Sequence, residues 1–265
     1  MPDMIRKVHV HMPYLLLGRH LPMVLAKKLN LEIYFSHDAL QSLDRNQCAK
    51  VSRTLENAGL KVTFHAPFMD LRPGALDDGI RRASLDRIRQ VFDLIPIFKP
   101  LKIVCHPSFD QRYYVSCDDL WLENSVNFWR QLIVQAEDGG AVIALENVYE
   151  REPGILRRLL EALHSRQVCF CFDTGHFNVF ARAPLEDWME QLGRFIGHLH
   201  LHDNFGKFDE HLPVGGATFP FGLFFAALKK LDVRPTVTLE AHAEEHLWQS
   251  LANLRNSSYL DGLNL

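Results

Sequence analysis

Short apolar segments alternate with longer amphipathic segments eight times along this chain, and no other feature limits its fold as strongly. The short segments predict strands at residues 8–10, 31–35, 61–65, 101–105, 141–145, 168–172, 196–201 and 236–239. Helices are predicted between them at residues 15–29 (starting near Pro22), 46–58, 77–98, 118–137, 153–163, 185–192, 221–231 and 244–254. Most strands are apolar at successive positions, which is typical of parallel strands covered on both faces.

Eight strand–helix units in 265 residues match the count and size of a closed (β/α)₈ barrel, which typically has about 250 residues. A hydrophobic content of 47% is sufficient to fill such a core. An open, doubly wound sheet is the alternative, but no GxGxxG motif follows the first predicted strand. We therefore predict an α/β protein, a (β/α)₈ TIM barrel in which residues 1–265 form a single domain.

Imidazole and carboxylate side chains occur at the ends of the predicted strands, from the third strand to the eighth. The candidate metal ligands are His65, His106, Glu146, Asp173, His176, His200, Asp209, His211 and Glu240. Asp209 and His211 are expected in the loop that follows the seventh strand, and His176 one short loop beyond the end of the sixth. Because the carboxyl ends of barrel strands converge on one mouth, we expect the whole set to lie together. A lone histidine at a strand end is more often a hydrogen-bonding loop residue, so the prediction depends on the joint pattern.

The segment 197–211, GHLHLHDNFGKFDEH, concentrates this chemistry. Its alternation puts His198, His200 and His202 on one face of a strand, and any of them could be a ligand or a supporting core residue. Imidazole and carboxylate together suit Zn²⁺, Mn²⁺ or Fe²⁺, and the five histidines of the set disfavour Mg²⁺. We predict a divalent metal site, with Zn²⁺ or Mn²⁺ preferred.

Charge gives a second argument for a cation. Three carboxylates at one mouth, those of Glu146, Asp173 and Glu240, would repel one another without a positive charge between them. Glu146 and Glu240 also have a possible catalytic use, because one carboxylate on each side of a substrate carbon can take a proton and return it elsewhere. The metal would polarise the adjacent carbonyl and hydroxyl.

Composition limits the partners. The net charge is −3 with no basic block, which weakens the case for nucleic-acid binding. The start of the chain, MPDMIRKVHVHMPY, has no apolar run of signal-peptide length, and no later segment has the length and apolarity of a membrane span. The five cysteines contain no CxxC pair, and Cys169 and Cys171 are expected to pack on one strand face as small apolar residues. These features predict a cytoplasmic protein with reduced thiols and no membrane contact.

The motifs FHAPFMDLRPG, VCHPSF, ALENV, CFDTGHFNVF, HLHLHDNFGKFDEHLPVGG and TLEAH occur in this order from the third strand to the eighth. In these motifs the chain resembles the xylose-isomerase-like barrel superfamily, which contains sugar isomerases and epimerases together with endonuclease IV. The resemblance to its ketose epimerases implies one metal held by Glu146, Asp173, His200 and Glu240. It also implies that the two glutamates do the acid–base work and that His176 touches the substrate.

The resemblance to endonuclease IV implies a different use of the same residues. In that branch all nine candidates would hold three zinc ions, and Phe68-Met69 resembles an apolar pair that the enzyme inserts into DNA. Against this reading, few positive charges lie near the predicted site, and Gly216 stands where endonuclease IV has a glutamate. Four phenylalanines near the strand-seven loop (Phe205, Phe208, Phe219 and Phe221) instead suit a small-molecule pocket.

Three functional hypotheses follow. The first is a metal-dependent isomerase or epimerase of a sugar, sugar phosphate or related polyol, with Glu146, Glu240 and His176 as its catalytic residues. The second is an endonuclease IV-like phosphodiester hydrolase that acts on abasic DNA, so nucleic acid is a partner only under this alternative. The third is a catalytically silent barrel that retains its metal.

Overall fold

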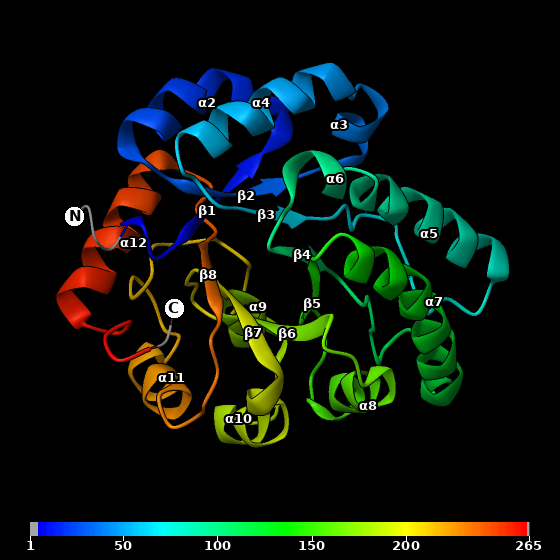
Figure 1. The fold of residues 1–265 in the computed structure, drawn as a ribbon. Coiled ribbons are helices and arrows are strands. Elements are labelled where there is room, and N and C mark those ends of the chain that lie inside the picture. The colour runs from blue at the N-terminus through cyan, green and yellow to red at the C-terminus, as the bar shows by residue number, and fades with distance from the viewer. Residues whose placement is uncertain (1–4, 264) are drawn as a thin grey trace.

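Eight parallel strands form a closed barrel in the computed structural model, which describes residues 5–263 and 265 (Figure 1). The strands are β1 (His9–Pro13), β2 (Asn30–Tyr34), β3 (Val62–His65), β4 (Lys102–Cys105), β5 (Val142–Glu146), β6 (Val168–Asp173), β7 (Ile196–Leu201) and β8 (Thr236–Leu239). They are hydrogen-bonded in sequence order, and His9 of β1 closes the ring by pairing with Thr238 of β8. The predicted TIM barrel is confirmed. Residues 1–4, with which the segment MPDMIRKVHVHMPY begins, lie outside the described residues, so the structure says nothing about that part of the signal-peptide prediction.

Helices surround the barrel (Figure 1). They are α2 (Tyr14–Lys27), α3 (His37–Gln41), α4 (Arg45–Asn57), α5 (Asp78–Phe92), α6 (Ile95–Phe98), α7 (Asp118–Asp138), α8 (Gly154–Leu163), α9 (Thr174–Phe180), α10 (Leu185–Leu192), the 3₁₀ turn η1 (Gly193–Phe195), α11 (Phe221–Leu228) and α12 (Glu244–Ser257). Among the described residues, no helix combines the length and the apolarity needed to cross a membrane.

Two helix predictions were wrong at a proline. The first helix begins at Tyr14 rather than near Pro22, and Pro22 lies inside α2. Leu17 and Val24 bury one face of α2 on both sides of the proline, and this packing holds the helix together. The helix predicted at 77–98 is divided into α5 and α6, because Pro96 has no N–H with which to continue α5 and instead lies in the first turn of α6.

The two faces of the strands differ in polarity. Outward side chains such as Ile33, Phe64 and Phe172 are fully buried between the barrel and the helices. Inside the barrel, the described residues form a small apolar cluster of Val104, Ala144 and Cys171, with Cys169 packed against it. All five cysteines are free, and Cys169 and Cys171 pack as small apolar residues, as predicted. Buried polar side chains occupy other parts of the interior, and more of them lie at the carboxyl ends of the strands.

Candidate metal centre

The carboxyl ends of β3 to β8 meet at one mouth, and the nine candidate ligands lie there. Six come from the strands: His65 (β3), His106 (directly after β4), Glu146 (β5), Asp173 (β6), His200 (β7) and Glu240 (directly after β8). The other three, His176, Asp209 and His211, follow β6 and β7 and reach the same mouth. Alternation of side chains along each strand explains why these residues point inward while their apolar neighbours face the helices.

Asp173 has a structural role as well as a place at the mouth. It ends β6 and caps α9, because its Oδ1 accepts a hydrogen bond from the backbone N–H of His176 at 2.6 Å. The short loop predicted between Asp173 and His176 is therefore wrong, since α9 begins at Thr174 and His176 lies in its first turn. Gly175 between them is required by close packing: a Cβ there would lie 1.9 Å from Cε1 of His202. A short helix, rather than a loop, thus holds the His176 imidazole at the mouth.

Asp203 stabilises the segment that follows β7. Its carboxylate accepts hydrogen bonds from the backbone N–H groups of Ala217 at 2.8 Å and Phe219 at 3.0 Å, and its backbone pairs with that of Leu212. This closure holds Asp209 and His211 in the lining of the mouth. His211 adopts φ +50°, a left-handed conformation that costs energy in a non-glycine residue.

Glu146 lies at the centre of the imidazoles. Its Oε2 is 3.0 Å from Nε2 of His106 and 3.4 Å from Nε2 of His65. Its Oε1 is 3.1 Å from Nδ1 of His176 and 3.2 Å from Nδ1 of His200. One buried carboxylate therefore borders two groups of nitrogen donors, which is the arrangement of a ligand that can bridge neighbouring ions.

Nδ1 of His200 is surrounded by three carboxylates. It lies 3.2 Å from Glu146 Oε1, 3.3 Å from Glu240 Oε1 and 3.6 Å from Asp173 Oδ2. Metal–ligand bonds of about 2.0–2.2 Å require neighbouring donor atoms to be about 3.0–3.5 Å apart, so the spacing fits one divalent ion. A second group lies beside it, in which Asp209 Oδ2 is 3.0 Å from His211 Nε2 and 3.4 Å from His176 Nε2.

Several buried polar atoms of the mouth make no well-aligned hydrogen bond among the described residues. They include Asp209 Oδ1, and also His106 Nε2 and Glu146 Oε2, which lie 3.0 Å apart without hydrogen-bond alignment. Buried polar atoms are almost always paired, because an unpaired one costs free energy. Here the donors face a shared space, as ligands of a cation do. Buried clusters of histidine, glutamate and aspartate thus provide a suitable site for a divalent metal.

The pKa values of the mouth residues show how strongly the carboxylates and imidazoles depend on one another. Burial raises the pKa of Glu146, but the imidazoles of His200 and His106 outweigh it and hold the pKa well below its usual range. Burial lowers the pKa of His211, but its contacts with Asp209 and Glu240 raise it to about 9. Each carboxylate therefore needs a neighbouring positive charge, and a divalent cation can supply it in place of imidazole protons.

A cavity of about 410 Å³ opens above these residues. Its wall is aromatic, with Tyr34, Phe68, Tyr149 and Phe180. The Phe68 ring stacks on His106 with ring centroids 4.5 Å apart, whereas Met69 at the rim is 67% exposed. The pocket is thus suited to a small molecule, and Phe68 is one of its wall residues.

The phenylalanines predicted to form the pocket lie elsewhere. Phe219 and Phe221 are buried against each other on the helix side of the barrel, and Phe219 also contacts Phe224. Phe205 is 57% exposed and Phe208 is 72% exposed. That prediction was wrong because nearness in sequence to the strand-seven loop does not determine which way the rings point.

The prediction also missed residues from the first two strands and from the rim. His11 of β1 and His242, after β8, line the cavity, and Glu32 of β2 lies 2.9 Å from the far side of the His200 ring. His202, whose role was left open, has its Nε2 3.1 Å from both carboxylate oxygens of Asp173. Period-two counting through HVHMP and NLEIY would have placed His11 and Glu32 inside the barrel.

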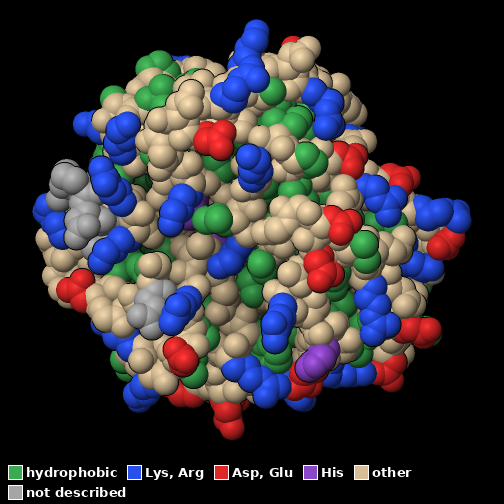
Figure 2. Space-filling view, viewed as in Figure 1, with side chains coloured by type: hydrophobic (Ala, Val, Ile, Leu, Met, Phe, Trp, Pro, Cys, Tyr) green, Lys and Arg blue, Asp and Glu red, His purple; other side chains and the backbone are tan. Residues whose placement is uncertain are grey.

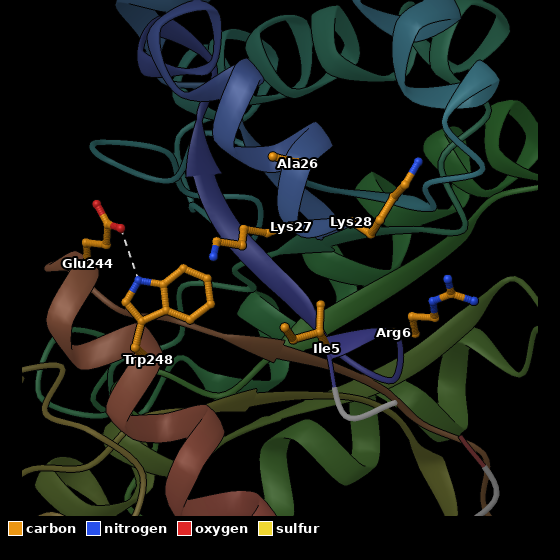
Figure 3. A pocket seen from close by; sticks show the side chains of 7 residues that line it. All are labelled: Ile5, Arg6, Ala26, Lys27, Lys28, Glu244 and Trp248. Carbon is orange, nitrogen blue, oxygen red and sulfur yellow. Dashed lines mark hydrogen bonds between the residues drawn. The ribbon is translucent and has the colours of Figure 1, made fainter. Parts of the chain in front are cut away.

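A larger cavity, of about 610 Å³, lies outside the barrel between α2 and α12 (Figure 3). Its lining is basic and apolar, and the one lining carboxylate that the structure describes, Glu244, accepts a hydrogen bond from Trp248 Nε1 at 3.0 Å. Metal chemistry therefore belongs to the smaller cavity. On the face shown in Figure 2, lysine and arginine are common and histidine is sparse, so the histidine-rich mouth opens elsewhere.

A closed eight-stranded parallel barrel whose mouth gathers buried histidines and carboxylates suited to a metal is the class of protein that the fold and the site define. Within that class, the chain belongs to the family described as the xylose isomerase-like TIM barrel, whose model matches residues 27–257. The resemblance inferred from the motifs is thereby confirmed.

Individual relatives are more distant. An uncharacterized protein of Methanocaldococcus jannaschii is 27% identical over 188 residues, which cover 68% of this chain and 64% of that protein. The L-ribulose 3-epimerase of a Methylomonas strain is 29% identical over 136 residues, 49% of this chain and 46% of that protein. The matches thus span less than two thirds of either relative. A solved structure described as a D-tagatose 3-epimerase-like protein has the same fold, with a TM-score of 0.78, 22% identity and coverage of 97% and 98% of the two chains.

Proposed function

We propose that this protein is a metal-dependent epimerase or isomerase that acts on an uncharged sugar. The observation that supports it most directly is that Glu146 and Glu240 approach Nδ1 of His200 from two different strands, at 3.2 and 3.3 Å. The likeness to a ketose 3-epimerase and to a 3-epimerase-like structure agrees with this assignment.

The proposed reaction uses the two glutamates as a proton-transfer pair. A divalent cation held by Glu146, Asp173, His200 and Glu240 would polarise the carbonyl and the neighbouring hydroxyl of the sugar. One glutamate takes the proton from the carbon beside the carbonyl, and the other returns a proton to the opposite face, which inverts that carbon. Return of the proton to the neighbouring carbon would instead give an isomer. His176, which lines the cavity, hydrogen-bonds a substrate hydroxyl.

Deuterium exchange tests this proposal without knowledge of the product. Manganese-loaded protein is incubated in D₂O with a panel of free ketoses that includes D-tagatose and D-fructose, and the carbon-bound protons are followed by NMR. Loss of one carbon-bound proton next to the carbonyl supports the proposal. No exchange on any ketose, from protein shown to hold metal, would contradict it and would support the catalytically silent, metal-retaining barrel.

The cavity lining favours an uncharged sugar over a sugar phosphate. None of the described residues that line it is lysine or arginine, and its charged lining residues include Glu146, Asp209 and Glu240. A phosphate dianion is normally held by arginine, lysine or a helix N-terminus, and here it would face carboxylates. We expect kcat/KM to be at least tenfold higher for D-tagatose than for D-tagatose 6-phosphate, measured at saturating Mn²⁺. A preference for the phosphate would show that a cation outside the described lining reaches the substrate.

A phosphodiester hydrolase of the endonuclease IV type is a second candidate because the mouth offers more ligands than one ion needs. His65, His106 and Glu146 could hold another ion, and so could His176, Asp209 and His211. The test is cleavage of a duplex oligonucleotide with one abasic site by zinc-loaded protein, together with the metal content per chain. Cleavage that an Asp173→Asn variant loses, with two or three ions bound, would favour the hydrolase; one ion and no cleavage would exclude it.

A further inference from the structure

A line of polar side chains runs inside the barrel from Lys102 to the candidate metal centre. Lys102 Nζ lies 3.2 Å from Thr236 Oγ1, which contacts Nδ1 of His198. Nε2 of His198 lies 2.9 Å from Oε2 of Glu32, and Oε1 of Glu32 lies 2.9 Å from Nε2 of His200. The side chains of Glu32, His198 and His200 are fully buried, so water does not compete for these contacts.

The acceptor-only carboxylate of Glu32 fixes the protons along this line. Because Glu32 cannot donate, the ring proton of His198 lies on Nε2, where it is donated to Oε2 of Glu32. Nδ1 of His198 then accepts from the Thr236 hydroxyl, whose oxygen accepts from the Lys102 ammonium. Nε2 of His200 faces the same carboxylate at 2.9 Å, which favours a proton on that nitrogen.

Glu32 has enough partners to remain a carboxylate in the barrel centre. Thr63 and Thr238 donate to its Oε2 at 3.2 and 3.0 Å, in addition to His198. Its Oε1 lies 2.9 Å from Nε2 of His200, and neither atom makes a hydrogen bond with any other group among the described residues. With Nε2 facing Glu32, Nδ1 is the nitrogen of His200 that faces Glu146, Asp173 and Glu240.

We propose that the line from Lys102 through Thr236, His198 and Glu32 sets the tautomer of His200, so that Nδ1 is the nitrogen offered to a divalent cation. Glu32 is thus a positioning residue that acts through His200. A carboxylate behind a ligating imidazole orients the ring and raises its basicity, and loss of such a partner typically costs about 10–100-fold in metal affinity. The inference rests on the metal site of the proposed function.

Zinc affinity, measured by competition with a chromogenic chelator, tests the role of Glu32. Glu32→Gln keeps the size of the side chain but removes one acceptor oxygen, and we expect it to weaken Zn²⁺ binding by about 10–100-fold. Thr63→Val is the matched control, because Thr63 donates to the same carboxylate but lies outside the line. It is expected to change the affinity less than threefold. Equal affinities for Glu32→Gln and wild type would overturn the proposal.

The tautomers can be observed in the unaltered protein, which guards against a variant that fails to fold. Long-range ¹H–¹⁵N spectra of ¹⁵N-histidine-labelled protein should show His198 protonated on Nε2, and His200 protonated on Nε2 with and without Zn²⁺. A His198 ring protonated on Nδ1, or a His200 ring bound through Nε2, would overturn the proposal.

The same titration separates failure of this inference from failure of the metal site itself. If the wild type binds no Zn²⁺, the proposed metal site is wrong, and if Asp173→Asn binds Zn²⁺ as tightly as wild type, Asp173 is not one of its ligands. If wild type binds, Asp173→Asn does not, and Glu32→Gln matches Thr63→Val, only the role of Glu32 is wrong.

Discussion

Replacing Glu240 with glutamine is expected to reduce kcat on the preferred ketose by at least a thousandfold at saturating metal. A carboxylate can take a proton from carbon and return one, whereas an amide of the same shape can do neither. Glu240 is 7% exposed and faces Nδ1 of His200, so the substitution fits the site without a change in packing volume. The measurement is turnover by coupled or chromatographic assay, with the melting temperature of each protein.

Glu245→Gln is the control for this experiment. Glu245 is exposed on α12, five residues beyond Glu240, and the same change of charge there is expected to leave kcat within twofold. A Glu240→Gln protein that keeps more than a tenth of the wild-type kcat would remove Glu240 from the proton-transfer pair. The chemistry would then have to depend on Glu146 with a different partner.

The barrel could be predicted from the sequence because its signal is local. A short apolar run that is covered on both faces is visible in five successive residues, and the predicted seventh and eighth strands have the bounds of β7 and β8. The ligands at strand ends were visible for the same reason. His200 and Glu240 each stand in or directly after such a run, and the barrel closure then brings distant strand ends together.

The features that were missed depend on contacts between distant segments. α9 begins where it does because the Asp173 side chain caps it, and no periodicity marks so short a helix. Glu32 looks like an exposed residue between Leu31 and Ile33, although its burial is explained by His198 and His200, more than 160 residues later. Phe68 forms the pocket wall because it stacks on His106, which directly follows the next strand.

The polar interior connects the fold to the proposed chemistry. Barrel interiors are usually filled by branched apolar residues, which need no partners. Here Glu32, Thr63, His198 and Thr238 fill the layer beneath the mouth and satisfy one another. A buried carboxylate such as that of Glu32 costs free energy unless it is well paired. Its position below the candidate ligands is best explained by its contact with His200, whose orientation and basicity it determines.

Replacing Asp173 with asparagine is expected to have the other large effect, which is on metal binding. Asparagine caps a helix about as well as aspartate, so the hydrogen bond from the His176 N–H to Oδ1 and the start of α9 can persist. The anionic ligand is lost, because a neutral amide neither offsets the charge of a divalent ion nor binds it as strongly. We expect Zn²⁺ affinity to fall by at least a hundredfold and turnover at limiting metal to fall with it.

Asp173→Ala separates the two roles of this residue. Alanine removes the cap as well as the ligand, and loss of an N-cap typically costs about 1 kcal/mol. In the presence of a chelator, therefore, Asp173→Asn should melt close to wild type and Asp173→Ala should melt several degrees lower, while both bind Zn²⁺ poorly. If Asp173→Asn binds Zn²⁺ as tightly as wild type, then Glu146, His200 and Glu240 suffice for the ion, and Asp173 serves mainly to cap α9.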